Sequence, residues 1–268
     1  MCFKKLFPSW FTNTEPISII PVKRRALLFG INKYGGGNDL QGCINDIEDV
    51  KAKLNKEFPD FEIIMYKNSQ VTGKIFFNTI KEALLVMRSG DVLYIHYSGH
   101  GTQIPSSQEA NGYHEALYLF DGAFIDDQIQ TLQSMTPEGA KVIAKFDSCF
   151  SGDLLRECMG NPRYIKNKFY PLPGVKIRKN VVNKFAKSTK DILKWVVFSG
   201  CSEEQTSADA YFNGRYNGAF TYFDNMSYNE KSTYNSEINN LHNYLPSSDY
   251  EQNPTLDGDN SLFNDIVF

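Results

Sequence analysis

In the first part of the chain, short apolar runs alternate with amphipathic segments, and this alternation constrains the fold more than any other feature. RRALLFGI (24–31) precedes CINDIEDVKAKLNKEF (43–58), in which apolar residues recur at helical spacing. The pattern repeats with FEIIMYK (61–67), IFFNTIKEALLVM (75–87) and DVLYIHY (91–97). Strands that alternate with helices are joined by right-handed crossovers and therefore run parallel. We predict an α/β fold in three layers, with a mostly parallel central sheet flanked by helices.

Weaker signals extend this pattern toward the C-terminus. Apolar runs predict strands at 116–120, 140–146 and 194–199, residues 218–226 are typical of a helix, and residues 251–263 are expected to form a loop with a short final strand.

A basic segment interrupts the alternation. Residues 156–194 hold eleven Lys or Arg against two acids, Glu157 and Asp191, and several prolines end the periodicity there. Long loops of this kind inside compact domains are usually functional or disordered. We therefore predict an exposed, flexible loop in which basic residues such as Lys166 and Lys168 are accessible.

Composition limits the classes of function. A chain of 268 residues with 41% apolar residues can bury a core without a cofactor or a disulfide framework, and its five cysteines include no CxxC pair. A net charge of −3 gives no general attraction to nucleic acids or anionic membranes. The chain has no run of eighteen apolar residues and no secretory signal near its N-terminus. We expect a cytoplasmic protein with no nucleic-acid or membrane partner.

Two of the predicted strands end in residues that can carry chemistry. YIHYSGHGTQ (94–103) places His100 on a glycine-flanked turn, and VIAKFDSCFSGD (142–153) brings Cys149 to the same edge of the sheet, where open parallel sheets bind ligands. A histidine beside a cysteine can increase its thiolate fraction and then protonate a leaving amine. No third orienting side chain is evident, so we expect a backbone carbonyl to orient the imidazole. The alternative for Cys149 is a buried, inert thiol.

These motifs, in this order, resemble those of a known family. HYSGHG and DSCFSG, preceded by ALLFGINKYGGGNDLQGCINDIEDV and followed by FSGCSEEQTSADA, GRYNGAFTY and EQNPTL, are similar to type I metacaspases, which are cysteine peptidases of the caspase fold. The resemblance spans about residues 24–262. It implies a short N-terminal extension (1–22) and one caspase-like peptidase domain (23–268). Within that domain the expected parts are a large-subunit-like part (23–155), the basic loop (156–193) and a small-subunit-like part (194–268).

The resemblance also implies roles for individual residues. Cys149 would be the nucleophile and His100 the general acid and base, with the backbone amides of Gly101 and Cys149 holding the oxyanion. The specificity pocket would consist of Cys43, Asp46, Ser98 and Asp147. Two carboxylates in such a pocket would recognise Arg or Lys.

Two residues near this pocket have alternative interpretations. Asp46 can instead cap a helix or complement its dipole. Lys145, where metacaspases usually carry an apolar residue, can partly neutralise Asp147 or be an exposed lysine at a strand edge.

Metacaspases commonly require calcium, but this sequence departs from the family there. Asp126 and Asp127 match one acidic pair, and Asp153 can contribute another carboxylate or cap a helix. His114 and Arg156 stand where aspartates are expected, and Arg156 can replace the cation by pairing with the acids. We expect no required cofactor and, at most, a weak calcium site.

Together these features predict a monomeric cysteine endopeptidase, made as a zymogen, that cleaves proteins or peptides after Arg or Lys. It would process itself within the basic loop. One alternative is a caspase-like scaffold with little turnover that acts by binding proteins, and another is a relative that acts on other amide bonds.

Overall fold

The computed structural model describes residues 23–107, 113–149, 165–175, 194–201 and 207–268. Its centre is a six-stranded sheet in the order β12-β9-β7-β3-β1-β2. Neighbouring strands are parallel except β12, which is antiparallel to β9. The strands are β1 (Arg24–Gly30), β2 (Phe61–Lys67), β3 (Val92–Ser98), β7 (Lys141–Asp147), β9 (Val196–Ser199) and β12 (Thr255–Gly258). The predicted α/β fold with a mostly parallel sheet is confirmed.

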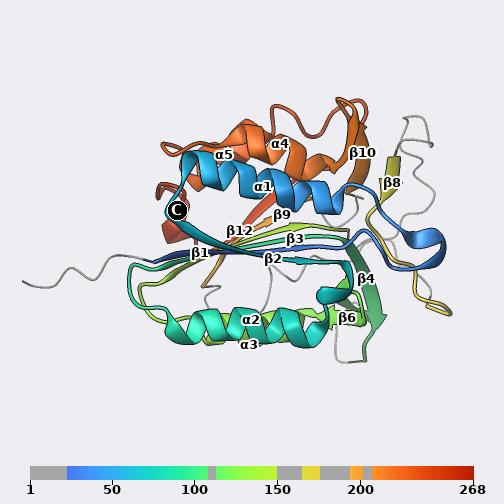
Figure 1. The fold of residues 1–268 in the computed structure, drawn as a ribbon, viewed down its shortest axis with the longest axis horizontal. Helices are drawn as coiled ribbons and strands as arrows, with labels where there is room; N and C mark the ends of the chain where they lie inside the picture. Colours follow the sequence, from blue (N-terminus) through green and yellow to red (C-terminus); the bar gives the residue numbers. More distant parts are fainter. Residues whose placement is uncertain (1–22, 108–112, 150–164, 176–193, 202–206) are drawn as a thin grey trace, which may run out of the picture.

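Helices cover both faces of this sheet, which gives three layers (Figure 1). Helices α1, α4 and α5 lie on one face, and α2 and α3 on the other. Alternate residues of β1 face the two layers: Ala26 and Leu28 pack into one apolar core, Leu27 and Phe29 into the other. The helices are α1 (Cys43–Glu57), α2 (Gly73–Val86), α3 (Asp126–Ser134), α4 (Ala219–Ser227) and α5 (Tyr234–Leu241).

Two small antiparallel sheets lie beyond the carboxyl ends of the parallel strands (Figure 1). One consists of β4 (His100–Pro105), β5 (Tyr113–Leu119) and β6 (Gly122–Ile125). The other consists of β8 (Ile165–Asn167), β10 (Ala208–Phe212) and β11 (Arg215–Gly218). The short 3-10 helices are Gly36–Asn38, Asn68–Gln70 and Asn260–Leu262. The two small sheets flank the edge at which the predicted catalytic residues meet.

The strands and helices predicted from periodicity are present, with ends shifted by a few residues. The basic segment differs from the prediction, because β8 lies within it and pairs with β10. None of the helices among the described residues is long and apolar enough to span a membrane. The predicted N-terminal extension, residues 1–22, lies outside the described residues.

Candidate active site

The site begins where β3 and β7 end side by side. Ser98 and Asp147, the last residues of these strands, are register partners, and the Gly99 amide donates a hydrogen bond to the Asp147 carbonyl at 3.3 Å. Cys149 lies two residues beyond β7. His100, predicted on a glycine-flanked turn after the strand, is the first residue of β4 and is separated from β3 only by Gly99. The sheet therefore brings the histidine and cysteine segments to one edge.

Backbone and aromatic groups orient the His100 ring. Its Nε2 lies 2.7 Å from the Asn38 carbonyl oxygen, which is the expected orienting contact from a backbone carbonyl. The His100 amide donates to the Tyr34 hydroxyl at 2.8 Å, and the Tyr34 ring packs against the imidazole at 4.6 Å between centroids. Within the described residues Nδ1 has no hydrogen-bond partner. With Nε2 directed at a carbonyl, Nδ1 is the nitrogen that can accept a proton.

Cys149 is completely buried among the described residues. Its Sγ donates to the Ser207 carbonyl at 3.3 Å and accepts a hydrogen bond from the Ser207 amide. Burial raises the pKa of the thiol well above its usual value, and the neighbouring Cys201 raises it further. Burial also lowers the pKa of His100 to about 4, although the Asn38 and Lys168 carbonyls oppose this shift. Both groups are therefore neutral near pH 7 in this conformation.

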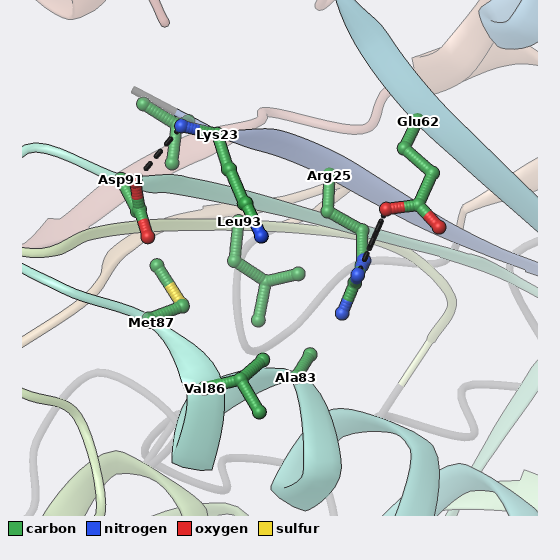
Figure 2. Close-up of a pocket in the computed structure, with 9 residues that line it drawn as sticks. Lys23, Arg25, Glu62, Ala83, Val86, Met87, Asp91 and Leu93 are labelled. Atoms are coloured by element: carbon green, nitrogen blue, oxygen red, sulfur yellow. Dashed lines mark hydrogen bonds and ion pairs between the residues drawn. The ribbon is translucent and has the colours of Figure 1, made fainter. Parts of the chain in front are cut away.

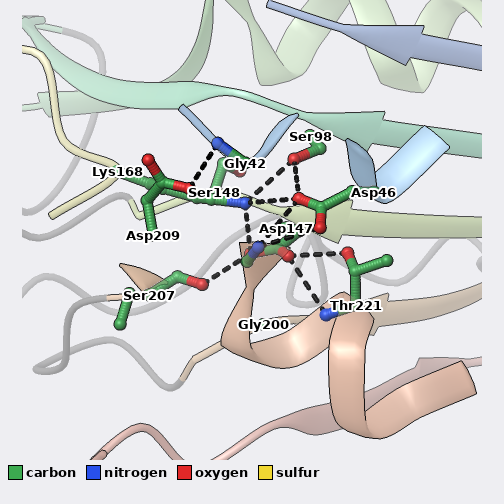
Figure 3. Close-up of polar contacts among 12 residues, drawn as sticks. Gly42, Asp46, Ser98, Asp147, Ser148, Lys168, Gly200, Ser207, Asp209 and Thr221 are labelled. Carbon is green, nitrogen blue, oxygen red and sulfur yellow. Dashed lines mark hydrogen bonds and ion pairs between the residues drawn. The ribbon is translucent and has the colours of Figure 1, made fainter. Parts of the chain in front are cut away.

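The predicted pocket residues form a buried acidic site, and this site contains a lysine (Figure 3). The Lys168 ammonium lies 3.2 Å from Asp46 Oδ2 and 3.0 Å from Asp147 Oδ1, and it donates to Ser98 Oγ at 2.9 Å. The side chains of Lys168 and the two aspartates are 0% exposed. The fourth predicted residue, Cys43, is also fully buried. The prediction that Lys168 is exposed is wrong, because three polar groups compensate its desolvation.

The two carboxylates differ in their remaining partners. The Asp147 carboxylate accepts hydrogen bonds from the Ser207 hydroxyl and from both the amide and the hydroxyl of Thr221. Burial opposes ionisation of Asp147, but Lys168 and these donors outweigh it and lower the pKa. For Asp46 burial dominates and raises the pKa to about 7, against the attraction of Lys168. The site is therefore matched to a single ammonium or guanidinium group.

Asp46 does not cap its helix. The residue before α1 is Gly42, and the Asp46 carboxylate instead accepts from Ser98 Oγ, Asn217 Nδ2 and the Gly218 amide. The capping alternative is wrong, whereas Asp46 does lie in the first turn of α1, as the helix-dipole alternative requires, and its carboxylate is directed at the pocket. At Gly218 a Cβ atom would collide with Asp147 Oδ2 and Lys168 Nζ, so a glycine leaves room for the long side chain.

The backbone around Lys168 also lies against the site. The Lys168 carbonyl oxygen accepts from the Gly101 amide at 2.9 Å and from the Cys149 amide at 3.1 Å. The Lys168 amide donates to the Ser207 carbonyl at 3.0 Å, which continues the antiparallel pairing of β8 with β10. The two amides predicted to hold an oxyanion thus share one acceptor, the carbonyl of a lysine whose side chain fills the acidic pocket.

Lys145 occupies neither predicted position. It is 1% exposed and pairs with Asp224 at 2.8 Å and with Glu237, not with Asp147. Its ammonium also lies over the Tyr228 and Phe198 rings, at 4.1 and 4.8 Å from their centroids. Lys145 is therefore a core residue on the α4 and α5 side of the sheet, and both interpretations from the sequence are wrong.

The acidic pair proposed for calcium lies elsewhere, at the start of α3. Asp126 Oδ1 is 3.2 Å from His114 Nδ1, and one ligand atom from each of His114, Asp126 and Asp127 lies within 4.8 Å of the others. Calcium takes six to eight oxygen ligands, and this described set offers two carboxylates and an imidazole, so it does not fit calcium well. Asp153 and Arg156, the other predicted participants, lie outside the described residues.

A shallow pocket at the opposite end of the sheet contains none of the predicted site residues (Figure 2). It lies at the amino ends of β1 and β3 and the C-terminal end of α2, and Lys23, Arg25, Ala83, Met87 and Asp91 are among its lining residues. The Asp91 carboxylate accepts from the Lys23 and Arg88 amides, which makes it a local structural contact.

Several site residues were not identified from the sequence. The sequence predicts an exposed loop at Lys168. Asp209, whose carboxylate accepts hydrogen bonds from the Gln41 and Gly42 amides, appears in the sequence only as part of a motif. Ser207 lies within FSGCSEEQTSADA and Thr221 within GRYNGAFTY, but neither carries a spacing signal of its own. A lysine flanked by short polar and aromatic residues has no periodicity that distinguishes it from a solvated one.

The fold and this site define the class: an α/β protein of caspase-like architecture with a cysteine and a histidine at adjacent strand ends. The sequence profile described as "Metacaspase, peptidase C14 domain" matches residues 24–157. This match covers half of the chain. The chain belongs to the metacaspase family of cysteine peptidases.

Individual proteins agree with this assignment. Metacaspase-1 of Coccidioides immitis is 29% identical over 92% of this chain, and Metacaspase-1 of Mycosarcoma maydis is 28% identical over the same share. The aligned parts are 63% and 73% of those proteins, respectively, so the chain spans only part of their length. The crystal structure of protein GSU0716 from Geobacter sulfurreducens superposes with a TM-score of 0.68 at 25% identity, covering 92% of this chain and 98% of that one.

Proposed function

We propose that this protein is a cysteine endopeptidase that cleaves after Lys or Arg, with Cys149 as the nucleophile and His100 as the general acid and base. One observation carries the proposal: Lys168 has its ammonium in the acidic pocket and its carbonyl oxygen between the Gly101 and Cys149 amides. A residue held at both points has the position required of the residue on the acyl side of a cleaved bond. Lysine and arginine share the charge that this pocket recognises.

We propose the following reaction for these residues. Cys149 Sγ turns from the Ser207 carbonyl toward the substrate carbonyl carbon, and His100 Nδ1 takes its proton as the C–S bond forms. The Gly101 and Cys149 amides stabilise the oxyanion. The imidazolium then protonates the leaving amine, the C–N bond breaks and a thioester remains. His100 next accepts a proton from water, which attacks the thioester and releases the acid and the thiol.

We infer that the resident substrate is the chain's own Lys168–Phe169 bond, and that the uncleaved chain is a zymogen. The segment fills the pocket and covers Cys149 and His100, which are 0% and 3% exposed. A second substrate must displace this segment or wait until the bond is cut. Self-processing would therefore be intramolecular and would open the site to other peptides. This location lies within the basic loop in which self-cleavage was expected.

The remaining expectations stay predictions. Activity without calcium is supported by the mixed ligand set of His114, Asp126 and Asp127. A monomer and a cytoplasmic location rest on the family resemblance and the composition alone.

The direct experiment is a panel of fluorogenic peptides ending in Arg, Lys or Asp, assayed with wild type, Cys149→Ala and His100→Ala. We expect cleavage of the Arg and Lys peptides only, with a loss of about 10⁴-fold or more in either variant and unchanged circular dichroism. Preference for Asp, or near-wild-type turnover in a variant, contradicts the proposal. No turnover at all by wild type would instead favour the protein-binding scaffold.

A further inference from the structure

The segment after Lys168 continues along the site in a defined register. The Tyr170 amide donates to the Gly101 carbonyl at 2.8 Å, and the Thr102 hydroxyl donates to the Tyr170 carbonyl at 2.8 Å. Phe169 forms a parallel bridge with Gly101. Because Gly101 also binds the Lys168 carbonyl, these bonds fix the position of Tyr170 relative to the Lys168–Phe169 bond. Tyr170 is the second residue on the leaving-group side.

The Tyr170 side chain lies in an aromatic environment made by three parts of the fold. Its ring stacks on Tyr118 with centroids 3.8 Å apart and planes 12° from parallel. The rings of His100 and Tyr34 lie 5.7 and 6.1 Å away, at steeper angles. Tyr118 is the cross-strand partner of His100 on β5, so the stacking surface is attached to the catalytic histidine's own sheet.

This aromatic surface is built into the fold. Tyr34 is fixed by hydrogen bonds to the His100 amide and to the Tyr97 hydroxyl at 3.3 Å. The Tyr97 hydroxyl in turn donates to the His100 and Tyr118 carbonyls at 2.8 and 2.9 Å. These contacts, which do not involve the Tyr170 segment, position the Tyr34 side chain and the Tyr118 backbone relative to the scissile bond.

We propose that Tyr118, with Tyr34 and His100, forms a specificity subsite for an aromatic residue two positions after the cleaved bond. This proposal rests on the proposed function and extends it to the leaving-group side of the substrate. The preferred peptides have Lys or Arg, then any residue, then Tyr, Phe or Trp. Stacking of this geometry contributes to binding beyond the area that it buries. An aromatic residue also holds the leaving amine beside His100, which must protonate it.

The test uses the full chain and two quenched-fluorescence peptides. One has the sequence of residues 165–172 with Ala in place of Lys166, so that a single lysine remains, and the other also has Ala in place of Tyr170. We expect wild type to cleave the tyrosine peptide with a kcat/KM about threefold to tenfold higher. The resident segment competes equally with both peptides, so this ratio does not depend on how much of the chain is self-processed.

Variants then locate the subsite. In Tyr118→Ala the ratio should fall to within about twofold of unity, and Tyr118→Phe should keep it, because stacking needs the ring and not the hydroxyl. Tyr244→Ala, a substitution of a partly exposed tyrosine that stacks on Phe223, is the matched control and should keep the ratio. A ratio near one in wild type, or one that survives in Tyr118→Ala, overturns the subsite. Failure to cleave a simple fluorogenic lysine amide would instead overturn the proposed function.

Discussion

Two buried lysines in this protein have nearly the same chemistry and different consequences. Lys145 and Lys168 are each almost inaccessible and are each paired with two buried carboxylates. Lys145 is an interior residue of β7, with register partners on β3 and β9. Lys168 follows a three-residue strand, and its carbonyl oxygen accepts hydrogen bonds from the amides of Gly101 and Cys149, next to the proposed catalytic side chains. Burial and charge pairing alone therefore do not distinguish a core salt bridge from a recognition site.

The surroundings of the two lysines distinguish a core salt bridge from a recognition site. Lys145 on β7 pairs with Asp224 on α4 and Glu237 on α5, and all three side chains are buried in the core between the sheet and these helices. The Asp46 and Asp147 carboxylates also accept hydrogen bonds from Asn217, Gly218, Ser207 and Thr221, so groups other than the lysine satisfy part of their hydrogen-bonding capacity. A site that is partly satisfied without its cation can exchange that cation, whereas a core triad cannot.

Stability should show the largest difference between the two lysines. Lys145→Met leaves two carboxylates buried without their cation, and we expect it to cost about 3 to 5 kcal/mol of unfolding free energy. Lys168→Met should cost less than about 2 kcal/mol, because its segment can lift and admit water. Denaturant unfolding of both variants in a Cys149→Ala background, where the chain stays intact, measures this difference. Equal losses of unfolding free energy in the two variants would contradict the proposed difference between Lys145 and Lys168.

Catalysis should show the reverse order for the carboxylates. Asp147→Asn should lower kcat/KM for Arg and Lys peptides, because a desolvated cation loses its charged partner. The expected loss of transition-state binding free energy is about 2 to 5 kcal/mol. Asp224→Asn, the matched change in the Lys145 triad, should reduce the unfolding free energy and leave the kcat/KM of the folded fraction within about threefold of wild type. Peptide kinetics, corrected for the folded fraction, measure kcat/KM for both variants. A similar loss of kcat/KM in both variants would count against an acidic recognition pocket.

A smaller effect concerns pH. Burial raises the pKa of Glu237 to about 8 and that of Asp46 to about 7, both above their values in an unfolded chain. These raised pKa values make the folded state bind more protons than the unfolded state, whereas burial lowers the pKa of His96 to about 3 and that of His100 to about 4 and so has the opposite effect below about pH 6.5. The net prediction is therefore that stability falls as pH rises between about 6.5 and 8. Glu237→Gln should flatten the upper part and Asp46→Asn the part below about pH 7. Unfolding curves in Cys149→Ala that rise with pH across this range would contradict these shifts.

The smallest effect is expected from calcium. With His114 beside Asp126, wild-type activity should change less than about twofold between excess chelator and millimolar calcium. His114→Asp adds a carboxylate to the cluster and should increase calcium affinity, as measured by calorimetry. Strict dependence of the wild type on micromolar calcium would show that other oxygen ligands complete the site.

Much of the fold could be predicted from the sequence, because the strands and helices of the central layers carry clear periodicity. Of the small outer strands the sequence predicts only β5, as the run 116–120. Helices α3 and α5 and the other outer strands are not predicted, since they are short and their pattern depends on tertiary contacts. The motifs also indicated the segments of His100, Cys149, Asp46 and Asp147. Lys145 and Lys168 could not be predicted, because a lysine gives no sign of burial until the chain brings carboxylates to it from distant positions.

We propose that Lys168 lies in the pocket as a substrate. Intact-mass spectrometry of the incubated wild type should show the chain converting into fragments of 168 and 100 residues, with one water added. Cys149→Ala should stay intact, and Lys168→Met should lose this cut while Lys166→Met, a change in the exposed neighbouring lysine, should keep it. An enzyme that turns over fluorogenic lysine peptides yet leaves its Lys168–Phe169 bond intact after prolonged incubation would contradict the account.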